Sequence, residues 1–504
     1  MADLRSVRAK KNIYVSLLCQ IVTLLCGLVV PKLLLDSFGS EVYGATTSIT
    51  QFLAYITILE GGVGGVARAV LYKPLANNDE RTISAILAEI KKFFWGIACI
   101  FLVYVIILAG SFKSISNLQQ LEQMSTALLV VVISISTFGQ YFIGISNSIL
   151  LQAAQQSYIT NLINLSGTIL NTVATVILVV LQCDIITVKF ISSFIFLLKP
   201  LALWLYVKKH YKICKVPSKK TKHLTQKWNG LGQHIAYFLH SNTDIVLLTC
   251  FSSLNKVAVY SVYNMVISHI QNLAMSFVSG MEALFGDMIA KEESKNLRKT
   301  VGHYETMISI VSVVLFATTA VLILPFVRLY TADVNDTNYE FPLFALLLTA
   351  AGLLYCLRTP YHSLVIAAGH FKSTNGAAYG EAIINILLSI ILLPKFGLCG
   401  VAIGTICATS FRFTYYVFYL SKHILNRNVF ISIKRISINT AIFISIYLVG
   451  TLIISHLPIT AYLLWCICGL VIAILAILFT LTVNFLFYRD ETVAVLRQIY
   501  QRNR

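Results

Sequence analysis

Charged residues are scarce in this chain. Asp, Glu, Lys and Arg make up 12% of its 504 residues, whereas a soluble domain carries roughly 25%. Long polar stretches are scarce as well, because only residues 208–230 form a gap between apolar stretches that is both long and strongly charged. The sequence therefore excludes a sizeable soluble domain within these residues.

Motifs that carry chemistry are missing too. The sequence contains no GKS/T phosphate loop, no HExxH and no GxSxG. The cysteines have no zinc-like spacing. These absences predict no enzyme, no metal site and no cofactor. The net charge of +18 does not predict nucleic-acid binding either, because the basic residues sit in short loops rather than on one soluble face.

Long apolar stretches dominate the chain, and hydrophobic residues make up 57% of it. A helix needs about 20 apolar residues to cross the hydrocarbon core of a bilayer, where each span must satisfy its own backbone hydrogen bonds. We expect an all-α polytopic membrane protein with about 14 transmembrane helices. The expected spans are 13–35, 42–64, 93–112, 124–150, 159–181, 187–207, 231–252, 258–285, 304–325, 341–368, 376–393, 399–420, 435–455 and 461–487.

The basic residues predict an orientation. With the N-terminus placed in the cytoplasm, 30 of the 39 Lys and Arg residues fall on the cytoplasmic loops and tails, and 6 on the outer loops and their edges. Cytoplasmic loops carry the excess of Lys and Arg in membrane proteins. We therefore expect both termini to be cytoplasmic.

The charged gap divides the spans into groups of six. A weak similarity relates the two groups: Asn171 matches Asn385, and Lys199 matches Arg412 to within one residue, at an offset of 214. Chance identity in low-diversity apolar sequence is the alternative to a duplication. Transporters are commonly built from such repeats. The predicted organisation is an N-lobe at 1–207 with spans 1–6, a basic cytoplasmic linker at 208–230, a C-lobe at 231–420 with spans 7–12, and spans 13–14 with a cytoplasmic tail at 421–504.

Polar residues recur at helical spacing in four spans. Steps of three and four residues place them on one face of each helix, and unpaired amides do not face lipid because hydrocarbon offers them no partner. For a single residue, hydrogen bonding between helices explains the pattern. Four long stripes favour a shared hydrophilic cavity that binds substrate. The stripe residues chosen for this role are Asn171, Asn264, Gln271 and Asn385.

Several ionisable residues fall inside the expected spans, where a charge usually has a partner or a function. Lys199, Arg358, Glu381 and Arg412 all fall in the cytoplasmic half. One interpretation is that Glu381 neutralises Arg358 or Arg412. The positive excess that remains could bind an anionic headgroup. Asp244, Glu282 and Glu381 are the carboxylates predicted to couple transport to an ion, and Arg68 lies just beyond a helix end.

Helix breakers accompany some of these charges. Lys199-Pro200 and Arg358-x-Pro360 predict broken helices that expose backbone groups to a cavity. The GGVGG run at 61–65 predicts close helix packing rather than a hinge.

Three segments carry a family resemblance. They are FGSEVYG at 38–44, LEGGVGGVARAVLYKPLANND at 59–79, and the stretch at 357–405 that contains LRTPYHSLVIAAGHFKSTNGAAYGEAIINILLS. These segments resemble the bacterial polysaccharide flippases called Wzx or O-antigen transporters. That family lies within the multidrug/oligosaccharidyl-lipid/polysaccharide exporter (MOP) superfamily.

The resemblance implies two pseudo-symmetric six-helix lobes that form a V, with two appended C-terminal helices. It implies that undecaprenyl-pyrophosphate-linked oligosaccharides, the repeat units of O-antigen, capsule or exopolysaccharide, cross the bacterial inner (plasma) membrane by alternating access. Arg68, Arg358 and Arg412 stand where family members tend to carry basic residues. The chain departs from the strongly cationic lumen of the family, because Glu60, Asp244, Glu282 and Glu381 nearly balance the basic set.

The implied partners are the lipid-linked oligosaccharide, membrane lipids, and the glycan polymerase and glycosyltransferases of the same pathway. Net export needs a gradient of the substrate or of a coupled ion, H⁺ or Na⁺. Three alternatives stay open: a small-molecule or multidrug exporter of the same superfamily, a membrane-embedded glycan polymerase or ligase, and a scaffold that transports nothing. The Asn-rich stripes favour sugars over hydrophobic cations.

Overall fold

A computed structural model describes residues 2–61, 63–214, 231–277 and 281–502. All regular secondary structure in these ranges is helical, which confirms the predicted all-α class. The contacts divide the chain into two compact units. Unit 1 comprises Met1–Phe238 and Leu248–Ala258, and unit 2 comprises Leu239–Leu247 and Val259–Arg504.

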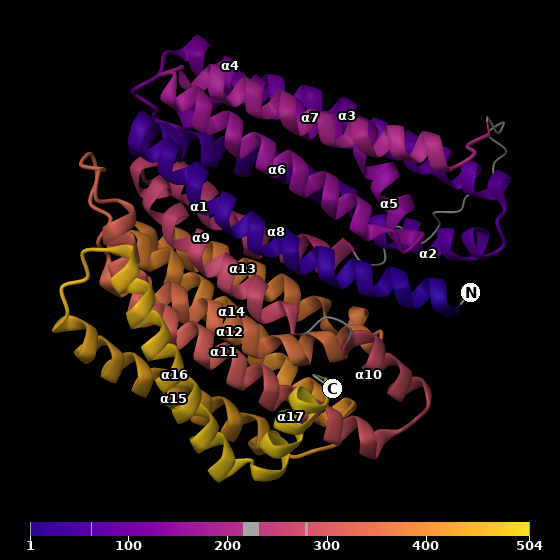
Figure 1. The fold of residues 1–504 in the computed structure, drawn as a ribbon, viewed down its shortest axis with the longest axis vertical. Helices are drawn as coiled ribbons and strands as arrows, with labels where there is room; N and C mark the ends of the chain where they lie inside the picture. Colours follow the sequence, from indigo (N-terminus) through magenta and orange to yellow (C-terminus); the bar gives the residue numbers. More distant parts are fainter. Residues whose placement is uncertain (1, 62, 215–230, 278–280, 503–504) are drawn as a thin grey trace. The chain divides into compact units, whose positions relative to one another are not determined.

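Unit 1 is built from the N-terminal helices, coloured indigo to magenta in Figure 1. In its core α1 packs on α6, while α4 packs on both α3 and α7. The elements are α1 (Ala2–Ala54), a 3₁₀ helix (Tyr55–Glu60), α2 (Val63–Ala76), α3 (Glu80–Ser116), α4 (Gln123–Gly139), a π-helical turn (Gln140–Gly144), α5 (Ile145–Ala153), α6 (Ser157–Val180) and α7 (Ile185–His210).

Unit 2 takes the middle of α8 and nearly all that follows (Figure 1). Helix α14 packs on α12 and α13, and α11 packs on α12, α15 and α16. The elements are α8 (Leu231–Phe251), α9 (Leu254–Ser276), α10 (Met281–Ala290), α11 (Ser294–Tyr330), α12 (Pro342–Ala367), α13 (Phe371–Phe396), α14 (Leu398–His423), α15 (Val429–Ser455), α16 (Tyr462–Phe487) and α17 (Arg489–Arg502).

Eleven helices among the described residues are long and apolar enough to cross a membrane, so the chain is a multi-pass membrane protein. The expected spans 13–35 and 42–64 lie on two helical stretches of α1 that meet at a kink at Gly39 (φ 78°, ψ 172°), and the second stretch continues into the 3₁₀ helix. The expected span 231–252 falls on α8, and the expected span 258–285 covers most of α9 and the first residues of α10. Helices α8 and α9 are less apolar than the eleven, since polar side chains such as Asp244 on α8 interrupt them.

Local sequence explains where two of the spans begin. Asp79 caps α3 by accepting a hydrogen bond from the Thr82 amide (3.0 Å), and Asp184 caps α7 by accepting from the amides of Ile186 and Thr187 (3.0 and 3.1 Å). Hydrogen bonds from Thr82 and Thr187 stabilise the charged carboxylates and lower the pKa of both aspartates.

The predicted helix breaks at proline are wrong, because α7 continues through Pro200 and α12 through Pro360. Packing against neighbouring helices, as of α7 on α4 and α6, outweighs the hydrogen bond that each proline removes. The predicted close packing of the glycine run is also wrong for two of its residues. A Cβ at Gly64 or Gly65 would meet nothing within 4 Å. Instead Gly61, with φ of 55°, ends the 3₁₀ helix.

The two halves share the same helix ending at the predicted offset of 214 residues. Helix α5 ends at Ala153 and helix α12 at Ala367. Each is followed by one left-handed residue, Gln155 (φ 59°) and Gly369 (φ 68°), and then by the next helix. This correspondence supports a duplication over chance identity. The predicted linker at 208–230 lies largely outside the described residues, which stop at Cys214 and resume at Leu231.

Cys214 provides a test of the predicted orientation. It is exposed, and its amide donates a hydrogen bond to Ser84 (3.0 Å) at the membrane end that carries the basic segment. We expect a membrane-impermeant thiol reagent to label Cys214 only from the cytoplasmic side. A variant that keeps Cys214 as its single cysteine makes the readout unambiguous, and Cys214→Ser is its control. Labelling from outside would invert the topology.

Candidate functional site: a buried polar column in unit 2

Small residues bring α13 and α14 together. Gly400 and Gly404 lie one turn apart on α14, and a Cβ at Gly400 would meet the Leu392 carbonyl carbon at 2.6 Å. A Cβ at Gly404 would lie 3.1 Å from the Ser389 amide nitrogen and 3.2 Å from the Asn385 carbonyl oxygen. These close approaches let short polar side chains on α13 reach α14 directly.

The first part of the site is an Arg–Glu–Arg triad. Glu381 on α13 forms ion pairs with Arg358 on α12 and with Arg412 on α14, the latter at 2.5 Å. All three side chains are buried, with exposed fractions of 4% for Arg358, 0% for Glu381 and 2% for Arg412. One carboxylate therefore serves two guanidiniums on two other helices, and the triad keeps a formal charge of +1.

Aromatic residues surround the triad. The Arg412 Nε donates to the Tyr416 hydroxyl (2.8 Å), and the Arg358 guanidinium lies 5.1 Å from the Tyr355 ring centroid. His362 lies beside Tyr416, with its Nδ1 3.5 Å from the hydroxyl. These contacts supply hydrogen bonds and cation–π attraction to charges that are removed from water.

The second part of the site surrounds Asp244 on α8, which is 5% exposed. Its Oδ2 accepts from the Tyr260 hydroxyl (2.9 Å) and lies 3.1 Å from the Thr405 Oγ1. The same Thr405 oxygen lies 3.1 Å from the Val401 carbonyl and accepts from the Asn385 amide (3.0 Å). Because a hydroxyl carries one proton, Thr405 can donate to Asp244 or to Val401, but not to both at once.

At this end, Asp244 Oδ1, Asn385 Oδ1 and Ser389 Oγ are buried oxygens without a hydrogen-bond partner among the described residues. Buried polar atoms are nearly always paired, so an unpaired group needs an explanation such as an ion or a water molecule. A cluster of acceptor oxygens around a carboxylate has the chemistry to hold a proton or a hard cation.

The two parts form one column. Glu381, Asn385 and Ser389 follow one another at one-turn spacing on the buried face of α13, and Thr405 and Arg412 lie on the facing side of α14. We call these residues, with Arg358 and Asp244, the polar column. The Glu381 carboxylate and the Asn385 amide of the α13 stripe are therefore paired with neighbouring helices, as the interhelical alternative predicts.

The other predicted site residues lie elsewhere. In unit 1, Arg68 is exposed and donates to Gln152 (3.1 Å), and Lys199 lies 4.1 Å from the Phe196 ring centroid. Asn171 is buried, and its Oδ1 has no hydrogen-bond partner within the described ranges. In unit 2, Asn264 and Gln271 are half-buried on α9, and Glu282 is exposed at the start of α10. The structure brings Asp244, Arg358, Glu381, Asn385 and Arg412 into one column.

The sequence interpretation missed Tyr260, Thr405 and Tyr416. A signal existed on α14, where Thr405, Thr409, Arg412 and Tyr416 are spaced by four, three and four residues and all lie on one face. It also missed a second ion network, in which Arg435 on α15 pairs with Glu305 (2.8 Å) and Glu491 (2.5 Å). That network attaches α17 to α11 and α15.

The fold of this chain is similar to the folds of several solved transporter structures. The lipid II flippase MurJ in an inward closed conformation matches with a TM-score of 0.69 at 15% identity, over 95% of this chain and 99% of that one. The chain has the fold of the MOP-superfamily transporters. No family model and no curated protein matches it.

Two MATE transporters share the MOP fold less completely. An inward-facing multidrug resistance MATE family transporter gives a TM-score of 0.57 at 13% identity, over 80% of this chain and 98% of its own. The MATE multidrug transporter DinF-BH gives 0.54 at 17% identity, over 85% and 96%. These similar structures are transporters and flippases rather than enzymes. At such low identity, the likeness concerns the fold alone.

Proposed function

We propose that the protein is a flippase that moves oligosaccharides linked to undecaprenyl pyrophosphate across the bacterial inner membrane by alternating access. The observation that carries this proposal is the extent of the MOP fold. A lipid flippase matches 95% of the chain, whereas the MATE transporters, themselves matched almost whole, leave 15–20% of this chain without a counterpart. The physical need is clear, because the hydroxyls of a sugar headgroup must be desolvated to cross hydrocarbon unaided.

The basic residues supply the proposed affinity for pyrophosphate. Arg358 and Arg412 outnumber their carboxylate partner, so the triad attracts an anion even when its ion pairs are intact. Lys199 and Arg68 are the proposed contributors from unit 1. Asn171, Asn264, Gln271 and Asn385 are the proposed contacts to sugar hydroxyls.

Ion coupling is proposed for the Asp244 end of the polar column, with H⁺ or Na⁺ as the coupled ion. The unpaired oxygens of Asp244, Asn385 and Ser389 support this assignment. Glu381 and Glu282 stay as secondary candidates. Glu381 already has two cationic partners, and Glu282 is exposed. The proposed biological partners are the glycan polymerase and the glycosyltransferases of the same pathway.

Multidrug export is the second candidate function, since two MATE multidrug transporters share the fold. The two functions require opposite ligand charge. A buried triad with a formal charge of +1 favours an anionic headgroup and disfavours an organic cation.

The test is flipping by the purified full chain in vesicles that contain a lipid-linked pyrophosphate oligosaccharide. We expect the protein to expose the sugar on both leaflets faster than empty vesicles do. We expect Arg358→Gln and Arg412→Gln to slow flipping, and Lys199→Gln to retain part of it, because a flexible ammonium is easier to replace than a bidentate guanidinium. Transport of an organic cation without sugar flipping would reject the proposal in favour of the exporter.

A further inference from the structure

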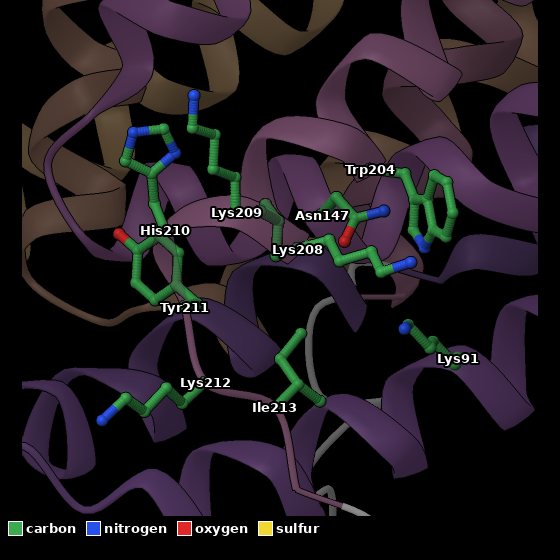
Figure 2. A pocket seen from close by; sticks show the side chains of 10 residues that line it. Lys91, Asn147, Trp204, Lys208, Lys209, His210, Tyr211, Lys212 and Ile213 are labelled. Atoms are coloured by element: carbon green, nitrogen blue, oxygen red, sulfur yellow. The ribbon is translucent and has the colours of Figure 1, made fainter.

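A second candidate site lies in unit 1. A cavity of about 520 Å³ opens at the C-terminal end of α7, beside α3 and α5, and Lys91, Asn147, Trp204, Lys208, Tyr211 and Lys212 line it (Figure 2). The proposed function assigns no role to this cavity.

The cavity is cationic. Four lysines line it, the fourth being Lys209, and none of the described lining residues is acidic. In Figure 2, the Lys91 and Lys208 ammoniums lie on the Trp204 side, whereas Lys209 and Lys212 point away from it. The Lys208 Nζ is 5.0 Å from the Trp204 ring centroid. Basic pockets between transmembrane helices on the cytoplasmic side are suited to anionic lipid headgroups.

The cavity wall is held in place by hydrogen bonds. The backbone amide of Tyr211 donates to the Val207 carbonyl (2.9 Å), and its hydroxyl donates to Gln156 (3.0 Å). The Cys214 amide donates to Ser84 on α3. Residues 211–214, which follow α7, are thus held against α3 and against Gln156, the residue that precedes α6. These bonds fix the backbone that carries Lys212.

Asn147 is an unsatisfied polar group in the cavity. It is 1% exposed, and its amide donates to the Ile143 carbonyl (2.7 Å), yet its Oδ1 has no partner in the part of the chain that the structure describes. A buried acceptor without a donor is costly. A hydroxyl of a bound headgroup would satisfy it.

Exposed apolar side chains lie on the same helices as the cavity lysines. Trp95 lies one turn from Lys91 on α3 and stacks on Phe142 with a centroid distance of 4.7 Å, and the two are 49% and 38% exposed. The Trp95 Nε1 donates to the Phe142 carbonyl (2.9 Å), within the π-helical turn. On α7, Leu198 and Leu205 are exposed as well. A cationic end beside an exposed apolar wall matches the two parts of a phospholipid.

We propose that this cavity binds the phosphate of an anionic phospholipid. Lys91 and Lys208 contact the phosphate, Asn147 accepts from a headgroup hydroxyl, and the acyl chains lie along Trp95 and Phe142. The predicted orientation places the cavity at the cytoplasmic leaflet, where anionic lipids create a negative surface. The ligand chemistry is a phosphate ester, which free phosphate shares in part.

Native mass spectrometry of the full chain in detergent tests the proposal. The protein is incubated with equal amounts of phosphatidylglycerol and phosphatidylcholine, with and without inorganic phosphate. We expect the wild type to retain phosphatidylglycerol selectively, with no competition by inorganic phosphate. The Lys91→Gln/Lys208→Gln variant should bind phosphatidylglycerol at least about tenfold more weakly, because one lysine near an anionic surface contributes about fivefold to binding. The matched control, Lys372→Gln/Lys422→Gln, removes two exposed lysines from unit 2 and should bind like the wild type.

The outcomes separate cleanly. Equal lipid binding by the Lys91/Lys208 variant and the wild type would overturn the proposal. Binding of inorganic phosphate without any retention of phosphatidylglycerol would assign the cavity to the free ion and reject the lipid. The thermal midpoint without added lipid, compared with that of the control variant, shows whether the substitutions disturb folding. Failure here leaves the flippase proposal untouched, because that assay measures a different site.

Discussion

Glu381→Gln is expected to lower the abundance and thermal stability of the protein more than any other single change in the polar column. Glu381 is fully buried between two guanidiniums on different helices. Removing its charge leaves two cations without a counter-ion in a site that water does not reach. Breaking one buried ion pair by removing one partner costs about 3–5 kcal/mol, and here a single change breaks two.

The triad also predicts that substituting either arginine lowers protein abundance less than substituting Glu381. Arg358→Gln leaves Glu381 paired with Arg412, and Arg412→Gln leaves it paired with Arg358, so each arginine variant keeps a neutral pair. We therefore expect both arginine variants to accumulate near wild-type levels. Glu381→Gln/Arg358→Gln should fall between them and Glu381→Gln, because it keeps a single unpaired cation.

Immunoblots of membrane fractions and thermal midpoints in detergent measure this order. Asp287→Asn is the control, since it breaks an exposed ion pair with Lys291 (2.7 Å) and exposed pairs contribute little. An apolar replacement of all three triad residues should recover stability without recovering transport. If Glu381→Gln accumulates like the wild type, the triad does not hold the helices together. If Arg358→Gln is as damaging as Glu381→Gln, pairing does not set the order.

The sequence predicted the helices well because long apolar runs have one physical solution in a bilayer. Spacing of three and four residues also placed Glu381, Asn385 and Ser389 on one face of α13. Spacing does not say which neighbour that face meets. The contacts with Thr405 and Arg412 depend on how closely α14 approaches, which Gly400 and Gly404 set through backbone contacts.

Side-chain contacts between residues far apart in the chain could not be predicted from the sequence. Arg435 lies at the first position of an expected span, which does not identify a partner, yet its side chain is buried with Glu305, 130 residues away. Asp244 was found because a lone carboxylate in an apolar stretch is rare. Tyr260 was missed as a partner because a lone tyrosine in such a stretch is ordinary.

Asp244→Asn is the second change with a large expected effect, this time on coupling rather than on stability. The asparagine keeps the shape of the side chain and an oxygen near Tyr260 and Thr405, so the local hydrogen bonds survive in part. It removes the negative charge that a proton or a cation would balance. We expect flipping driven by an imposed H⁺ or Na⁺ gradient to lose its response to that gradient, with normal protein abundance.

A Thr405→Val variant distinguishes Na⁺ from H⁺ as the coupled ion. Thr405→Val removes one neutral oxygen from the Asp244 end and leaves the carboxylate in place. A Na⁺ site would lose an oxygen ligand, so Thr405→Val should then weaken the sodium response together with Asp244→Asn. A proton needs only the carboxylate, so Thr405→Val should then keep the proton response that Asp244→Asn abolishes. Vesicle flipping under a sodium gradient or a pH gradient separates the two cases. A full gradient response in Asp244→Asn would show that Asp244 serves only to hold α8 against α9 and α14, as its bonds to Tyr260 and Thr405 allow.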